Sequence, residues 1–315
     1  MKKLRILVAN EPANLGGVDA WRIFWPFDLL ERTYPDEIEF VYSRGQILPY
    51  EFFQCDVVFC QRPFDASHVQ ALQMAKMHSK PIIIDFDDNF LNVPTGHADF
   101  KYLWNKGSVL AQCLQMADAI WVTTPALKEA YRHPNCTVIP NAILPETLPA
   151  EFNGNIGTVL WRGDVAHAED VACWRGEYER MLRRVDKFIW LRYMPSWASD
   201  ASGKTLLNPE WIPTQIYLDT LRTYKPAAIW KPLLPCPIND GKSNISLLEA
   251  TYSGGVCVTN YAGKPGWECA LRELPRKEAD YATAWQRAAD DIWQHYDLRA
   301  WNEIRYRELL KLARG

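Results

Sequence analysis

A polar segment around residue 240 combines groups that bind phosphate with a carboxylate that can bind a sugar. Backbone N–H groups at the start of the helix predicted over 243–253 are suited to hold diphosphate oxygens, and Lys242 would add a positive charge. Glu249 follows seven residues later, about two helical turns on, so it is expected on nearly the same helix face as Lys242. There it would accept hydrogen bonds from ribose hydroxyls. The candidate donor-binding residues of this segment are Asn239, Asp240, Gly241, Lys242, Ser243, Asn244 and Glu249.

The same segment fits a simpler alternative. It could be an N-capped helix in which Ser243 is the cap and Lys242 points into solvent. We favour a nucleotide-sugar site, because one helix face would then serve both the phosphate and the sugar.

Three carboxylates stand at the end of an apolar strand predicted over 81–86. They are Asp85, Asp87 and Asp88. Carboxylates this close do not all ionise without an energetic penalty, so they indicate a bound cation, a basic partner or a raised pKa. Asp85 and Asp87 also form an Asp-x-Asp tripeptide, whose hard oxygen atoms suit a divalent metal ion. In a further alternative, Asp87 and Asp88 only cap the next turn.

Two adjacent glycines, Gly16 and Gly17, follow the first predicted strand. They permit close approach of the backbone to a ligand and precede a helix predicted over 18–33. The segment is not a G-x-G-x-x-G fingerprint, and a tight turn explains the glycines equally well.

Strand-like runs alternate with helical patterns in two series, which is typical of parallel sheets flanked by helices. The predicted strands of the first series are 4–9, 38–42, 56–60, 81–86, 119–123 and 137–139, and those of the second are 156–162, 187–193, 227–231 and 255–259. A connection rich in Pro, Gly and Asn over 144–155 separates the series. The tail is predicted to form two helices, broken near 295–297. Ligands of open α/β sheets bind at the carboxyl ends of strands, so the loops after strands are the expected site.

Composition favours a globular protein of two domains and argues against several functions. The chain has 315 residues, of which 48% are hydrophobic, with 35 basic and 38 acidic side chains. This near balance argues against a protein held to nucleic acid mainly by counterion release. The longest apolar runs are strand-sized, so no integral membrane segment is expected. Eight scattered cysteines without a C-x-x-C motif suggest reduced thiols and a cytoplasmic location.

The segment from Lys242 to Glu249 resembles the donor-binding segment of retaining GT-B glycosyltransferases of the family-4-like, or group 1, type. Further matches are Asp85, Asp87, Asp88, Pro94 and His97 after the fourth strand, and Ile139-Pro140-Asn141 between the halves. The commoner family pattern has two glutamates. The second matches Glu249, whereas the first falls on Gly241, which leaves the contact to the transferred sugar unassigned.

The resemblance implies a GT-B fold, in which two Rossmann-like α/β domains with parallel sheets face each other across a cleft. The expected ranges are an acceptor-side domain over 1–148, a donor domain over 156–290, and a tail helix over 291–315 that packs back on the first domain.

The resemblance also implies an enzyme that transfers a sugar from a nucleotide-diphosphate donor, UDP- or GDP-linked, to an acceptor hydroxyl with retention of configuration. It assigns Arg162 and Lys242 to charge on the leaving diphosphate, with Lys231 as a weaker phosphate ligand. It places Gly16 and Gly17 beside the donor, and His167 where relatives carry a lysine. Asp87, Asp88 and His97 would handle the acceptor, which could be a glycan, a lipid-linked sugar, a protein or a modified nucleic-acid base. No metal bound by the protein is expected, although Mg²⁺ could accompany the diphosphate.

Three rival functions remain open from the sequence. One is a metal-dependent GT-A glycosyltransferase that uses Asp85 and Asp87 as ligands. Another is a sugar-nucleotide epimerase on the same two-domain architecture. The third is a nucleotide-binding module without catalytic activity, which the replacement of the first glutamate by Gly241 keeps open.

Overall fold

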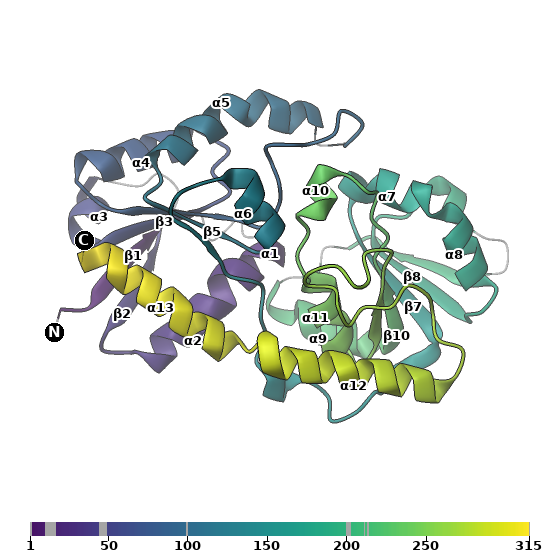
Figure 1. Cartoon of the computed structure of the whole chain (residues 1–315). Helices are drawn as coiled ribbons and strands as arrows, with labels where there is room; N and C mark the ends of the chain where they lie inside the picture. Colours follow the sequence, from purple (N-terminus) through teal and green to yellow (C-terminus); the bar gives the residue numbers. More distant parts are fainter. Residues whose placement is uncertain are drawn as a thin grey trace. The chain divides into compact units, whose positions relative to one another are not determined.

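The computed structural model describes residues 2–9, 17–43, 49–98, 100–199, 203–210, 212 and 214–314. The chain divides into two compact units, each built on its own parallel sheet (Figure 1). Unit 1 comprises Met1–Val93, Lys101–Asn141 and Leu298–Gly315, and unit 2 comprises Pro94–Phe100 and Ala142–Asp297. The predicted fold class, α/β with two parallel sheets, is confirmed.

The sheet of unit 1 has six parallel strands in the order β2-β1-β3-β4-β5-β6. The strands are β1 (Leu4–Val8), β2 (Ile38–Tyr42), β3 (Val57–Gln61), β4 (Ile82–Phe86), β5 (Ala119–Val122) and β6 (Cys136–Val138). The central strands β3, β4 and β5 are buried along their whole length. Such continuously buried strands are expected where helices cover both faces of a parallel sheet.

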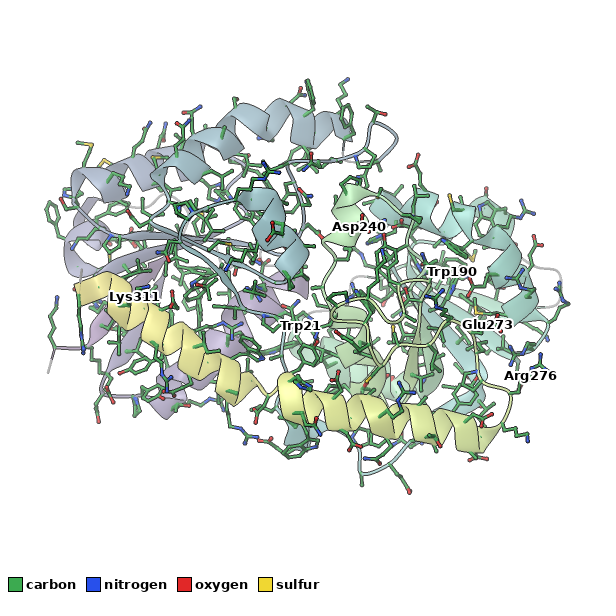
Figure 2. The ribbon with its side chains drawn as sticks, viewed as in Figure 1. Trp21, Trp190, Asp240, Glu273, Arg276 and Lys311 are labelled. Carbon is green, nitrogen blue, oxygen red and sulfur yellow. The ribbon has the colours of Figure 1, made fainter. Side chains whose placement is uncertain are left out.

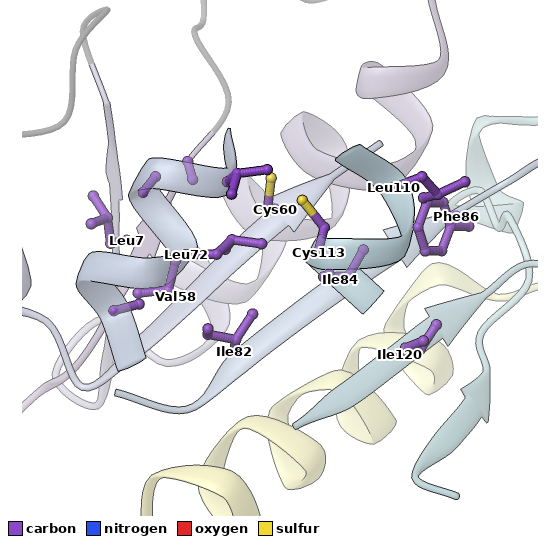
Figure 3. Close-up of a cluster of buried hydrophobic side chains, with 14 of the residues drawn as sticks. Leu7, Val58, Cys60, Leu72, Ile82, Ile84, Phe86, Leu110, Cys113 and Ile120 are labelled. Atoms are coloured by element: carbon purple, nitrogen blue, oxygen red, sulfur yellow. The ribbon is translucent and has the colours of Figure 1, made fainter. Parts of the chain in front are cut away.

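Helices cover both faces of this sheet. Those of unit 1 are α1 (Gly17–Asp19), the π-helix η2 (Ala20–Phe24), α2 (Trp25–Thr33), α3 (Pro49–Gln54), α4 (Ala66–Met77), α5 (Phe100–Met116), α6 (Pro125–Tyr131) and α13 (Leu298–Arg314). Alternate residues of β1 serve the two faces: Leu7 packs with α3 to α6, whereas Ile6 packs with α2 and α13. Figure 3 shows part of the hydrophobic core that contains Leu7, with Leu72 of α4 and Cys113 of α5 against β3 and β4.

Unit 2 contains a second parallel sheet, of five strands in the order β11-β10-β7-β8-β9. Its strands are β7 (Asn155–Gly163), β8 (Lys187–Arg192), β9 (Thr205–Asn208), β10 (Pro226–Trp230) and β11 (Val256–Val258). Its helices are η3 (Pro145–Thr147), η4 (Val165–His167), α7 (Ala168–Cys173), α8 (Arg175–Leu182), η5 (Ser196–Ala198), α9 (Thr214–Tyr224), α10 (Pro237–Asp240), α11 (Ile245–Tyr252) and α12 (Glu278–His295).

The core of unit 2 is rich in tryptophan. Trp161, Trp190 and Trp230 lie on neighbouring strands and are buried against Tyr178 of α8; Trp190 is labelled in Figure 2. On the other face of the sheet, Leu160 packs with residues of α9 and α11. These indoles stabilise the sheet and do not form a sugar-stacking surface.

The compact units differ from the predicted ranges at three places. The main change from unit 1 to unit 2 falls after Asn141, not at 148, and the return to unit 1 falls after Asp297, not at 290. A short stretch, Pro94–Phe100, belongs to unit 2 although it was predicted inside the first domain. The tail helix α13, in yellow in Figure 1, packs against α2 of unit 1 through Tyr306 and Leu309.

Two chemical expectations concern the whole chain. All eight cysteines are free thiols. Among the helices that the structure describes, none has both the length and the apolar character that a membrane span requires.

Candidate donor site in unit 2

An ion pair joins the end of β7 to α11. Nε of Arg162 lies 2.7 Å from Oε2 of Glu249. The Glu249 side chain is 1% exposed, whereas that of Arg162 is 26% exposed, so the carboxylate is interior and the guanidinium still reaches solvent. Burial raises the pKa of Glu249, and the nearby guanidinium opposes that shift. The pair holds Arg162 at the carboxyl end of the sheet, where ligands of such sheets bind.

Beside this pair, three side chains form a continuous polar chain. Nζ of Lys231, directly after β10, lies 3.2 Å from Nε2 of His167. Nδ1 of His167 lies 2.7 Å from Oδ2 of Asp170 on α7. The other carboxylate oxygen, Oδ1 of Asp170, accepts hydrogen bonds of 2.7 Å from the backbone N–H of Leu234 and from Nδ2 of Asn239. The histidine is therefore fixed at both ring nitrogens.

Close backbone packing leaves room for this histidine. A Cβ atom on Gly163 would lie 2.7 Å from the ring of Trp161 and 3.1 Å from Cδ2 of His167. Only glycine fits at this position without displacing one of the two rings.

Burial and like charges lower the pKa values of Lys231 and His167. Burial lowers the pKa of Lys231 to about 7, and the positive charges of Arg162 and Lys242 act in the same direction. Burial also lowers the pKa of His167 to about 3, with the Lys231 cation as the next cause. Several basic groups thus share one small region, in which burial disfavours the charged forms of Lys231 and His167. Such a region favours an anionic ligand.

The segment from Asn239 to Asn244 is arranged differently from the prediction. Helix α11 begins at Ile245, with Asn244 at its N-cap, so Ser243 is not the cap. Lys242 precedes the helix, which means that the predicted placement of Lys242 and Glu249 on one helix face is wrong. The backbone N–H of Lys242 instead bonds to the carbonyl of Asn239 in a turn between α10 and α11.

The residues of this segment divide between the site and the surface. Asn239 is buried and donates a hydrogen bond to Asp170, which links it to His167 and Lys231. Asp240, labelled in Figure 2, accepts hydrogen bonds of 3.0 Å from the Tyr261 hydroxyl and from Lys264 Nζ, with a half-exposed side chain. Gly241 follows as the C-cap of α10. Asn244 is buried.

Of the two predicted glycines, Gly17 begins α1, and a Cβ atom added there would meet nothing within 4 Å. Gly16 lies outside the described residues.

In unit 1, two of the three predicted carboxylates bind different arginines. Asp85 accepts hydrogen bonds from Nε and Nη2 of Arg22, at 3.0 and 2.5 Å, and both side chains are buried. Asp87 accepts two hydrogen bonds from Arg62, and Oδ2 of Asp88 lies 3.5 Å from the same guanidinium. Of the cation, basic partner or raised pKa that the cluster indicated, the structure shows basic partners.

His97 lies in unit 2, whereas Asp87 and Asp88 lie in unit 1. Its stretch of chain packs against the start of α7, where a Cβ atom on Gly96 would be 2.9 Å from Oε1 of Glu169. The predicted acceptor loop is therefore divided between the two units.

The sequence did not reveal three of these partners. Arg22 and Arg62 carry no signal of their own in the sequence, because their pairing with Asp85 and Asp87 arises only when distant segments meet. Asp170 has the spacing of an ordinary acidic residue in the first turn of a helix. The signal that could have found it is its position three residues after His167, a spacing that brings two side chains together on a helix.

No protein-family model and no curated protein matches the chain. Solved structures match it along almost its whole length. HepE of Anabaena, in complex with UDP-glucose, has 12% identity and a TM-score of 0.62, covering 98% of this chain and 100% of that chain. The α,α-trehalose 6-phosphate synthase of Burkholderia multivorans has 10% identity and a TM-score of 0.59, covering 99% of both chains.

A third match is the catalytic domain of starch synthase IV from Arabidopsis thaliana, bound to ADP and acarbose. It has 10% identity and a TM-score of 0.54, covering 99% of both chains. The chain has the GT-B fold. This confirms the fold that the resemblance implied, and the GT-A alternative is wrong, because a GT-B chain carries two separate parallel sheets. The Asp-x-Asp tripeptide of that alternative is instead held by Arg22 and Arg62.

Proposed function

We propose that this GT-B chain is a glycosyltransferase that moves a sugar from a nucleoside-diphosphate donor to an acceptor hydroxyl. The observation that carries the proposal is the cluster of Arg162, Lys231 and His167 at the carboxyl end of the unit 2 sheet, with Lys242 close enough to lower the pKa of Lys231. A compact group of basic side chains, among which Arg162 carries a permanent charge, suits the two charged phosphates of such a donor. Structures that share the fold include proteins bound to UDP-glucose and to ADP.

Within this proposal, Arg162 and Lys242 stabilise the charge that grows on the leaving diphosphate. Glu249 contributes by holding Arg162, because its carboxylate bonds directly to the guanidinium. A ribose contact of Glu249 stays a prediction. Asn239 joins the cluster through Asp170, and the turn from Asp240 to Ser243 would lie along the donor.

The finer features of the reaction are also proposals. We infer retention of the anomeric configuration, with a donor phosphate oxygen helping to deprotonate the acceptor. Mg²⁺ would arrive with the diphosphate, since the carboxylates of the cluster, Glu249 and Asp170, already bind Arg162 and His167. We expect a UDP- or GDP-sugar as donor, and Asp87, Asp88 and His97 as residues that act on the acceptor side.

A thermal-shift screen across UDP, GDP and their sugar derivatives tests the proposal. A ligand at 100 times its dissociation constant stabilises the folded protein by about 2.7 kcal/mol, which is readily measured. Glu249→Ala should reduce the shift, whereas Arg175→Ala, which removes an exposed arginine of the same unit, should not. The absence of a shift with every nucleotide would contradict the proposal.

Products separate the enzyme from its rivals. A glycosyltransferase slowly hydrolyses its donor when the acceptor is missing, and the sugar is released. An epimerase would convert the donor into an isomeric nucleotide-sugar without any acceptor. Tight nucleotide binding with neither product would indicate a binding module.

A further inference from the structure

The amine of Lys231 is held in an unusual position for a lysine. The residue is 5% exposed, and its Nζ lies 3.2 Å from a histidine nitrogen, not beside a carboxylate. Lysine is a strongly hydrated point charge that is rarely buried without a pairing anion. The carboxylate of Asp170 lies on the far side of His167 from the amine and bonds to the histidine.

The hydrogen bonds that link Lys231, His167 and Asp170 have a defined direction. Asp170 is an acceptor, because its Oδ1 already receives N–H bonds from Leu234 and Asn239. Nδ1 of His167 therefore donates to Oδ2 of Asp170, which leaves Nε2 as a lone-pair acceptor that faces Lys231. A neutral imidazole in this orientation binds the Lys231 amine but does not neutralise an ammonium.

Other charges around Lys231 come from four elements. Arg162 at the end of β7 and Lys242 before α11 repel an ammonium, whereas Asp170 on α7 and Glu249 on α11 attract it. Glu249 is already paired with Arg162. The remaining titratable neighbour, Cys257 on β11, is a buried thiol whose pKa is raised, so it carries no charge near neutral pH. Above about pH 7 the balance favours a neutral amine in the free protein and an ammonium once an anion is added.

We infer that Lys231 takes up a proton when a nucleoside diphosphate binds, and that His167 and Asp170 are positioning residues that aim its amine at the phosphates. The inference rests on the proposed function for the identity of the ligand. It adds that ligand binding at this site is coupled to protonation of Lys231, a property that the shared fold does not imply.

Isothermal titration calorimetry of the full chain with UDP and with GDP tests the coupling. At pH 8 a terminal phosphate, with a pKa of about 6, is fully ionised and takes no part in the exchange. Titrations in two buffers that differ in ionisation enthalpy then give the number of protons absorbed per bound nucleotide. We expect about 0.5 to 1 proton at pH 8, and a smaller number at pH 6, where the pKa of about 7 already leaves Lys231 protonated.

Two variants locate the proton. Lys231→Arg carries a permanent charge, so it should bind the nucleotide with no proton uptake at pH 8. Asp170→Asn should weaken binding by about tenfold and change the pH at which uptake is largest, because His167 loses the acceptor that orients it. A variant that only lost packing would weaken binding equally at every pH. The wild-type measurement in two buffers stands even if a variant fails to fold.

The outcomes are distinguishable. Binding at pH 8 without proton uptake would overturn the inference and leave the proposed function intact. Proton uptake that persists in Lys231→Arg would overturn it as well, since another group would then be the acceptor. Failure of both nucleotides to bind would contradict the proposed function itself.

Discussion

Arg22 donates two hydrogen bonds to Asp85 in the interior of unit 1, from Nε to Oδ1 at 3.0 Å and from Nη2 to Oδ2 at 2.5 Å. Its Nη1 donates to the carbonyl of Ile139, at 2.6 Å. A second buried guanidinium, that of Arg305 on α13, lies near enough for Arg22 to lower its pKa and for Asp85 to raise it. One carboxylate therefore serves two buried cations.

Asp85→Asn should destabilise the protein more than Arg22→Met does. The first variant leaves two cations without the carboxylate that balances them, which should lower the free energy of unfolding by about 3–5 kcal/mol. The second leaves one buried carboxylate, whose charge the Arg305 cation still partly balances, so we expect a smaller loss of about 1–3 kcal/mol. Urea denaturation measures both. Asp28→Asn, which breaks an exposed pair with Arg32, is the control and should change stability by less than about 1 kcal/mol. Equal losses in the two buried variants would show that Arg305 does not depend on Asp85.

Glu249→Ala should weaken nucleotide binding and lower stability together. Removing the carboxylate leaves Arg162 without its partner at the end of β7, so the guanidinium loses its fixed orientation. We expect about tenfold weaker binding of UDP or GDP by calorimetry, and a loss of about 1–3 kcal/mol in the free energy of unfolding. The matched control is Glu179→Ala, which breaks the exposed pair with Arg175. Full affinity in Glu249→Ala would show that the ion pair does not position Arg162.

Arg162→Ala should chiefly reduce turnover. A cation that meets charge growing on the leaving group contributes more in the transition state than in the ground state, and its loss typically lowers kcat about 10²–10³-fold. We expect Arg162→Lys to recover little of this, because an ammonium cannot bind two oxygens in a plane as guanidinium does. Steady-state kinetics of donor hydrolysis measures the effect. A change confined to KM would mean that Arg162 binds donor and transition state equally.

Acidification should destabilise unit 2 through His167. Its pKa is about 3 in the folded protein and near 6.5 in an unfolded chain. Between these two pH values the unfolded state binds a proton at His167 and the folded state does not. Stability is present above about pH 6.5 and decreases as the pH falls from there towards 3, by about 2 kcal/mol at pH 5. The hydrogen bond from His167 lowers the pKa of Asp170, so the stability that this carboxylate contributes is also lost on acidification, at still lower pH.

The comparison of wild type with His167→Gln isolates this effect. Urea midpoints at pH 7 and pH 5 should differ less in the variant, because glutamine does not titrate. An equal acid sensitivity in both proteins would assign the effect to other groups.

The strands of both sheets follow from short apolar runs, because a parallel strand covered on both faces has no polar side. The edge strand β9 escaped this reasoning, since its residues Leu206 and Leu207 are half exposed and lie in a polar neighbourhood. The helices α3 and α10 also escaped it, because six and four residues are too few to show a helical period.

The site was predictable where one residue carried its own signal. Arg162 and Glu249 each carry a separate signal in the sequence, and the structure joins them across 87 positions. His167 and Lys231 are weaker candidates in the sequence, and the structure places them in contact. The partners of Asp85 and Asp87 could not be foreseen, because a buried arginine and a surface arginine look alike in sequence. Only the folded chain brings Arg22 to Asp85 over 63 positions.

The last change of unit, after Asp297, determines the order in which the protein can be built during synthesis. Unit 2 is nearly continuous and has all its strands and helices once residue 297 has emerged from the ribosome, whereas the core of unit 1 still lacks Tyr306 and Leu309. Until α13 arrives, the nascent amino-terminal sheet and α2 expose the apolar side chains that Tyr306 and Leu309 later cover, and such exposed surface favours aggregation. The half that is made first is thus the half that finishes last.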